Sequence, residues 1–238
     1  VTSATDWKQT YYNVRSSWYG KKTYTYQYNR NVGKFITHSH TIRADYPVDI
    51  DFLHNTQGTI FIDAGQADLV IDGRLTNSLG QVTLTSQRDI SAKSTIDPQS
   101  PTGDGQPKAN IAARQILLTA GGRIGTDRTA LPVTITSPEV GTSATGYRID
   151  ASATTGVHIR QYIGVLRVGT ITATSGDRSV VSLAGDDGIL RAAGGSHRIT
   201  GGSISLTSAK GGIGLSGTGG DLLLDTGAGS AVLHLGMS

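Results

Sequence analysis

The sequence of 238 residues contains no cysteine, a single glutamate (Glu139) and one methionine. The absence of cysteine excludes a disulfide framework, a cysteine-ligated zinc ion and a thiol nucleophile. No apolar run approaches the ~18 residues that a transmembrane helix needs, so we expect no transmembrane segment. The chain begins at Val1 without a basic and then apolar signal region. We therefore expect a fragment or a processed product.

Good helix formers are scarce, whereas glycine is frequent, with 32 residues. Glycine inside a helix costs about 1 kcal/mol relative to alanine, so a helical protein is not expected. The same composition suits short strands joined by tight turns. Disorder is not expected either, because 37% of the residues are hydrophobic and the net charge is only +3. The composition therefore predicts an all-β fold.

Aromatic and basic residues are concentrated at the start of the chain. Residues 1–46 hold both tryptophans, seven of the nine tyrosines, and seven Lys or Arg against two Asp. We expect residues 1–57 to form an aromatic, basic β-hairpin module or cap, and residues 58–238 to form a second unit. No RNA-binding, zinc-finger or helix-turn-helix pattern accompanies the charge, so nucleic acid is not an expected partner.

Residues 23–28 alternate strictly between threonine or glutamine and tyrosine, and residues 29–33 supply turn residues before a second strand at 34–42. This pattern predicts an antiparallel hairpin. It places Tyr24, Tyr26 and Tyr28 on one face.

Beyond residue 58 the chain is a series of short apolar pairs spaced i, i+2, each followed by turn or small polar residues. They are Ile60/Ile62, Leu69/Ile71, Val82/Leu84, Ile116/Leu118, Val133/Ile135, Val157/Ile159, Leu166/Val168, Ile171/Ala173, Val181/Leu183, Ile204/Leu206 and Leu222/Leu224. Such spacing is also compatible with sandwiches and barrels.

Self-similarity favours a stacked architecture. The phrase VTLTSQRDI (82–90) recurs as ILLTAGGRI (116–124) and ISLTSAKGGI (204–213), and DLVIDG (68–73) recurs as DLLLDTG (221–227). A unit that buries only two or three side chains becomes stable when copies share a core, as in a parallel β-helix. We expect about six to eight irregular coils of roughly 20–30 residues each, with a proline-containing loop excursion at 94–108 and smaller loops at 126–132 and 137–145.

These phrases resemble the repeat regions of filamentous haemagglutinin-like giant bacterial adhesins, and of the leukotoxin-type filamentous adhesins in particular. The resemblance lies in QILLTAGGRIGTDRTALPVTIT (115–136), GVLRVGTITATSGD (164–177), GSISLTSAKGGIG (202–214), and the lead-in SSWYGKKTYTYQY (16–28) with ADYPVDIDF (44–52). It implies a right-handed parallel β-helix, or solenoid, in a protein that is secreted or displayed on the bacterial cell surface.

The resemblance also implies adhesion or extracellular scaffolding without catalytic residues or cofactors. We therefore expect a non-enzymatic segment of a cell-adhesion protein that presents a surface to cells or matrix polysaccharide. Flanking repeats of the same chain or neighbouring subunits are the expected partners, and glycans or a host-surface receptor are candidate ligands. The alternatives are a structural subunit of an extracellular fibre or sheath and a polysaccharide-degrading β-helix.

The most enzyme-like cluster is Gly185-Asp186-Asp187-Gly188 with His197. Paired carboxylates catalyse glycoside hydrolysis, but residues of neighbouring coils should lie about 20–25 positions apart, and Asp187 and His197 lie closer. Asp-Asp-Gly is also ordinary turn chemistry, so a turn is favoured. The glycine-rich 120–125 segment lacks the Walker pattern and is interpreted as a corner turn.

Two further patterns suggest metals, and both have a simpler interpretation. His38 and His40 project from one strand face, with His54 as a distant third candidate, but no zinc pattern is present. Residues 217–221 with Asp225 form one imperfect copy of a calcium-binding nonapeptide, which needs tandem copies. We expect no metal site.

The first region also contains the strongest candidate for ligand contact, because aromatic faces stack on sugars and nearby cations attract anionic polymers. Its residues are Trp18, Tyr19, Lys21, Lys22, Tyr24, Tyr26 and Tyr28. The alternative is that these rings form a cap or small core at the end of the rod.

Overall fold

The protein is described by a computed structural model. It describes residues 9–16, 20–27, 50–51, 58–93, 110–136, 145–195, 197–214, 221–226 and 232–237. These residues form nineteen β-strands and one 3-10 turn, Gly176–Arg178, with no α-helix among them. The expected all-β class is confirmed.

Two strands, β1 (Gln9–Ser16) and β2 (Gly20–Gln27), form a separate antiparallel sheet. Its register places Tyr12 opposite Tyr24 and Ser16 opposite Gly20. The strand expected at 23–28 is thus present through Gln27, but its described partner is β1. Residues 34–42, the partner expected from the sequence, lie outside the described residues.

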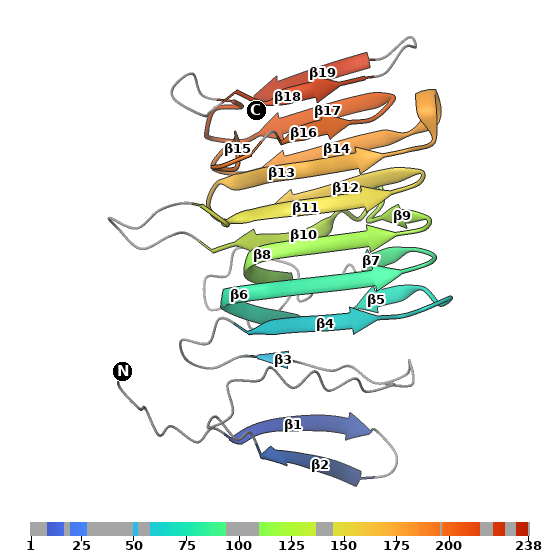
Figure 1. Cartoon of the computed structure of the whole chain (residues 1–238), viewed down its shortest axis with the longest axis vertical. Helices are drawn as coiled ribbons and strands as arrows, with labels where there is room; N and C mark the ends of the chain where they lie inside the picture. The colour runs from blue at the N-terminus through green and yellow to red at the C-terminus, as the bar shows by residue number, and fades with distance from the viewer. Residues whose placement is uncertain are drawn as a thin grey trace.

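The other seventeen strands form one sheet whose described pairings are all parallel (Figure 1). They are β3 (Ile50–Asp51), β4 (Thr59–Asp63), β5 (Leu69–Ile71), β6 (Arg74–Ser86), β7 (Ile90–Ala92), β8 (Asn110–Ala120), β9 (Arg123–Ile124), β10 (Leu131–Ile135), β11 (Arg148–Ala153), β12 (Gly156–Gln161), β13 (Leu166–Ala173), β14 (Val180–Gly185), β15 (Ile189–Arg191), β16 (Arg198–Thr200), β17 (Ser203–Ser208), β18 (Leu223–Asp225) and β19 (Val232–Met237). Parallel pairing begins at β3, where Ile50 is the partner of Leu75.

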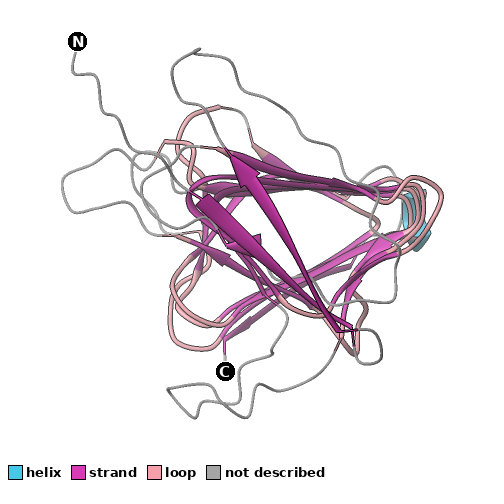
Figure 2. Ribbon diagram, turned by 90° about the horizontal axis from the view of Figure 1, so that it is seen from below, coloured by secondary structure: helices cyan, strands magenta, loops and turns pink. Residues whose placement is uncertain are grey.

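The strands surround a common interior on three sides (Figure 2). One series of neighbours runs β4, β6, β8, β11, β13, β16 and β18, and a second runs β5, β7, β9, β12, β14, β17 and β19. A third runs β3, β6, β8, β10 and β12. A parallel sheet that closes around its own interior in this way is consistent with a parallel β-helix.

The core consists of columns of apolar ladder partners that point inward. The first column is Ile62, Leu84, Leu118, Ala151, Ile171, Ile199 and Leu224. The second contains Leu69, Ile90, Ile124, Val157, Val181 and Ile204. All eleven apolar pairs expected from the sequence are buried in this core or packed against it, which confirms them as the inward positions.

Two of the three copies of the repeated phrase occupy equivalent positions in the structure. Val82 pairs with Ile116 and Ile90 pairs with Ile124, so the phrases at 82–90 and 116–124 lie in register. The third copy is displaced, because Ile204 occupies the column of Ile90 and Ile124. Every side of the structure needs the same apolar i, i+2 pair, so this phrase alone does not identify the side.

The corners depend on glycine where neighbouring turns approach closely. A Cβ atom on Gly121 would lie 2.1 Å from the Gln87 carbonyl oxygen, and one on Gly122 would lie 2.0 Å from Asp89 Oδ1. Gly125 also has a φ of 63°. Gly121 and Gly122 thus form the expected corner between β8 and β9, whereas Ala120 still belongs to β8 and Arg123 and Ile124 form β9.

The expected loops are only partly described. The loop expected at 126–132 ends earlier, because Leu131 and Pro132 already belong to β10 and are buried. A proline at this point is tolerated near the start of a strand. Residues 94–108, and those at 137–144, lie outside the described residues.

Candidate functional site

The two adjacent aspartates after β14 make structural contacts rather than facing each other across a groove. Asp186 Oδ1 accepts a hydrogen bond from Arg160 Nη2 at 3.0 Å, and Asp187 Oδ2 accepts one from the Gly164 amide at 2.8 Å. Each contact joins the turn to the preceding part of the sheet. Both carboxylates therefore act as turn and cross-strand acceptors, in agreement with the favoured interpretation.

His197 does not complete an acid–base pair with this turn in the described part of the chain, where neither a hydrogen bond nor an ion pair links it to Asp187. Its Nε2 is buried without a hydrogen-bond partner. Its ring packs beside Gly195, where a Cβ atom would lie 3.3 Å from the ring.

Charged side chains bridge neighbouring strands along the outside of the sheet. Among the residues that the structure describes, five ion pairs do so: Arg88–Asp68 (3.2 Å), Lys93–Asp72 (2.7 Å), Arg123–Asp89 (3.1 Å), Arg160–Asp186 (3.0 Å) and Arg198–Asp225 (3.3 Å). Most of these side chains are exposed, so each pair contributes at most about 1 kcal/mol. Asp89 also accepts a hydrogen bond from the Arg123 backbone amide. Asp89 therefore holds two neighbouring corners together through its backbone contact as well as through its ion pair.

A second cluster combines three arginines with Tyr147 and Tyr162, the two tyrosines that lie beyond residue 46. We call Arg114, Tyr147, Arg148, Arg160 and Tyr162 the arginine–tyrosine corner. The guanidinium carbon of Arg114 lies 5.3 Å from the centre of the Tyr147 ring, and that of Arg160 lies 4.6 Å from the Tyr162 ring. These are cation–π distances.

Further contacts hold the arginines of this corner in place. Arg114 Nη2 donates to the Thr145 carbonyl at 3.3 Å, and Arg148 Nε donates to Asp150 Oδ2 at 2.6 Å. Asp150 also accepts the Thr170 amide at 2.8 Å. The sequence does not reveal this corner, because its residues come from three separate segments, at 114, 147–148 and 160–162, that form no motif.

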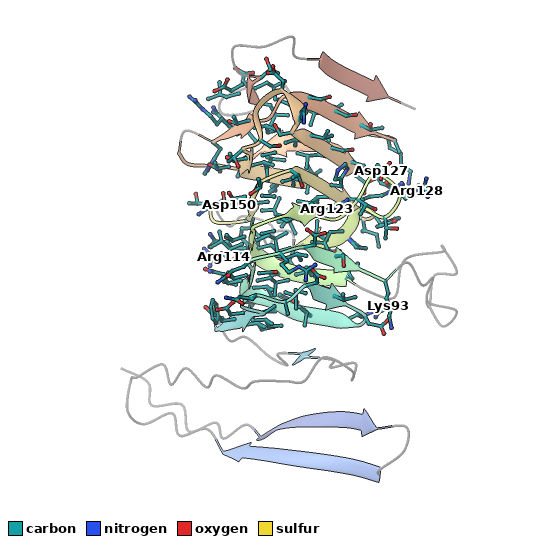
Figure 3. The ribbon with its side chains drawn as sticks, turned by 90° about the vertical axis from the view of Figure 1, so that its right-hand side faces the viewer. Lys93, Arg114, Arg123, Asp127, Arg128 and Asp150 are labelled. Carbon is teal, nitrogen blue, oxygen red and sulfur yellow. The ribbon has the colours of Figure 1, made fainter. Side chains whose placement is uncertain are left out.

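His158 is a third unusual group, on the outer side of β12. Its Nδ1 is buried without a hydrogen-bond partner. Burial lowers the pKa of His158 below its usual 6.5; the Asp127 carboxylate raises it and Arg123 lowers it further. Asp127 and Arg128 lie toward one edge of the stack, with Arg114 and Asp150 toward the other (Figure 3).

Comparison with family models, curated proteins and solved structures finds no match to this chain. Residue roles therefore rest on the chemistry of the chain itself.

No group of three potential metal ligands gathers among the residues that the structure describes. His38, His40, His54 and residues 217–220 lie outside them. Asp225, the remaining member of the calcium-like pattern, forms the ion pair with Arg198. Within the described ranges, no helix is long and apolar enough to cross a membrane.

The aromatic stripe expected near the N-terminus is only partly described. Trp18, Tyr19 and Tyr28 lie outside the described residues, whereas Lys21, Lys22, Tyr24 and Tyr26 lie on β2. The strand register pairs Tyr12 of β1 with Tyr24, a neighbour that the sequence pattern of β2 alone does not indicate. The ligand role of these residues stays a prediction.

Proposed function

We propose that residues 58–238 form a right-handed parallel β-helix of about six to eight coils. The inward columns support this proposal, because the same chain returns to each column once per passage around the interior. The expected handedness follows from the rule that crossovers between parallel strands of one sheet are right-handed in about 98% of cases.

Because the sequence contains no cysteine, pairs of engineered cysteines test this strand register without competing thiols. Ser182 on β14 and Ser205 on β17 are ladder partners on the outer side. We expect the S182C/S205C variant to form an intramolecular disulfide under mild oxidation, since partners on adjacent strands lie within bonding range. The S182C/T207C variant, displaced by two residues, exceeds the ~7 Å Cα limit and serves as the control. Equal cross-linking of both variants would contradict the register.

We propose that the protein is a non-enzymatic segment of a large secreted bacterial surface adhesin. In this role the stacked sheet extends the molecule and presents its outer sides to cells or matrix polysaccharide. The observation that carries this proposal is the use of Asp186 and Asp187, the most enzyme-like pair, as acceptors that tie neighbouring strands together. The resemblance of the repeat phrases to filamentous adhesins points to the same role.

An adhesion assay tests this function directly. Beads coated with the purified chain should adhere to epithelial cells or immobilised matrix glycans more strongly than beads coated with the heat-denatured chain. Absence of specific adhesion on every surface would overturn the adhesin role. The candidate ligand residue Tyr26 is tested in the same assay with Tyr26→Ala, and Phe61→Ala, at an exposed aromatic residue on β4, serves as its control.

A parallel assay tests the non-enzymatic character. The chain is incubated with neutral and acidic polysaccharides, and new reducing ends are measured. We expect none above background. Turnover that is lost in Asp187→Ala and retained in Asp177→Ala would establish a β-helical glycosidase and refute the proposal. Asp177 is a suitable control because it lies in the exposed 3-10 turn, away from the Asp186–Asp187 turn.

A further inference from the structure

The arginine–tyrosine corner gathers around one short strand. β10 pairs with β8 on one side and with β12 on the other. Arg114 directly follows Ala113, the partner of Ile135, and Tyr162 directly follows Gln161, the partner of Val133. Both residues therefore emerge beside the C-terminal half of β10, about two strand spacings, or ~10 Å, apart across the sheet.

The corner contains more positive than negative charge. Arg114, Arg148 and Arg160 are joined by Arg167, which precedes Val168, the ladder partner of Ile149 on the Arg148 strand. Three carboxylates, Asp150, Asp186 and Asp187, oppose these four arginines, which leaves one positive charge in excess. An anionic partner therefore meets a net attraction at this corner.

The arginines are also held in fixed orientations. Stacking on Tyr147 and Tyr162 orients the planes of the Arg114 and Arg160 guanidinium groups. Arg114 uses a single Nη2 bond to Thr145, which leaves other N–H donors of its fork for a ligand. In Arg160 the Nε is buried and Nη2 donates to Asp186, so Nη1 is the nitrogen left to meet a ligand. An oriented guanidinium loses less entropy when it binds a carboxylate, and its fork matches the two carboxylate oxygens.

Apolar surface adjoins these charges, because Ile163, next to Tyr162, is 55% exposed. Sugar rings present apolar C–H faces as well as charged groups, so a polymer of acidic sugars would engage both features. From this arrangement we propose that the arginine–tyrosine corner binds an acidic polysaccharide. Arg114 and Arg160 are the chief contacts, and they bind the carboxylates of the sugars. The proposal rests on the adhesin role and identifies a ligand class and site for it.

Polygalacturonate is the probe, because it carries one carboxylate on each sugar. Binding is measured by biolayer interferometry, with dextran as the neutral comparison and dextran sulfate as a test of unspecific attraction. We expect the wild-type chain to bind polygalacturonate with an affinity that falls as salt rises, and to bind dextran at least tenfold more weakly. The R114Q/R160Q variant should bind polygalacturonate about tenfold or more weakly than wild type, since two charge-assisted contacts are lost.

The matched control is R128Q/R178Q, which removes the same charge from exposed residues outside the corner. This control should bind within about twofold of wild type. A third variant, R114K/R160K, retains the charge but removes the planar forks, and should also bind more weakly. Melting temperatures of all variants are measured, and binding is compared well below the lowest of them.

Equal weakening of R114Q/R160Q and R128Q/R178Q would overturn the proposal, because binding would then follow overall charge alone. Unchanged affinity of R114Q/R160Q, or full affinity for dextran, would also overturn it. If R114Q/R160Q keeps wild-type affinity while the coated beads still adhere to cells, the corner is excluded and the adhesin role stands. If the wild-type beads do not adhere, the adhesin role itself fails.

Discussion

At the scale of single residues, a few polar side chains are buried together with the apolar core, and Gln161 is one of them. Gln161 is fully buried among β10, β12 and the following turn. Its Oε1 accepts the Ile135 amide at 3.0 Å, and its Nε2 donates to the Ile163 carbonyl at 2.8 Å. Both ends of the side-chain amide are thus satisfied, and a buried polar group in this state stabilises the fold.

We expect Gln161→Leu to lower the free energy of unfolding by about 2–4 kcal/mol, because it leaves a buried amide and a buried carbonyl unpaired. Urea denaturation followed by circular dichroism measures the change. Gln115→Leu makes the same chemical change at a half-exposed site and should alter stability by less than about 1 kcal/mol. A Gln161→Leu variant as stable as wild type would show that water replaces both contacts.

His158 predicts a dependence of stability on pH. Its folded pKa is lowered, chiefly by burial, so the unfolded state binds a proton more readily. The stabilisation from neutral His158 is therefore present above the unfolded value of 6.5 and is lost as pH falls from there through the folded pKa. We expect His158→Gln to lose less stability than wild type between pH 7.5 and 5, measured by melting temperature. Parallel curves for the two proteins would contradict this expectation.

At the scale of elements, we expect the inward columns to stabilise the sheet and the outer positions to tolerate substitution. Leu118 is 1% exposed in the middle of a column, between Leu84 and Ala151. Its neighbour Leu117 lies on the outer side of the same strand, between Thr83 and Asp150. One strand thus offers the same residue type in both environments.

We expect Leu118→Ala to cost about 2–5 kcal/mol, because it opens a cavity between stacked strands that cannot close. Leu117→Ala should cost less than about 1 kcal/mol. Thermal and urea unfolding of both variants provide the measurement. Similar losses for the two would mean that the outer side is covered as tightly as the inner one.

At the scale of the whole molecule, each strand contacts mainly its immediate neighbours in the sheet. In such an architecture, stability is close to a sum of local and nearest-neighbour terms. Damage at one strand should therefore spread to adjacent strands before it reaches distant ones.

Hydrogen exchange of Leu118→Ala tests this locality. We expect faster amide exchange in β6 and β11, the two strands that flank Leu118, and little change in β17 relative to wild type. Mass spectrometry of peptic fragments resolves these strands. Uniform acceleration along the chain would instead indicate a single cooperative unit.

Some properties of this protein follow from the sequence alone. Alternation of apolar and polar residues is a local property, so Val82 and Leu84 were predicted to face inward without knowledge of their partners. Glycines at the corners could likewise be assigned to turns, because positive φ and close approach favour glycine.

Only the tertiary structure decides which strands become neighbours, since every side needs the same apolar pair and the connections differ in length. It therefore moves Ile204 into the column of Ile90, pairs β2 with β1, and ties Asp186 to Arg160. It also brings Arg114 over Tyr147. Such contacts depend on register between distant segments, which a degenerate repeat does not encode locally.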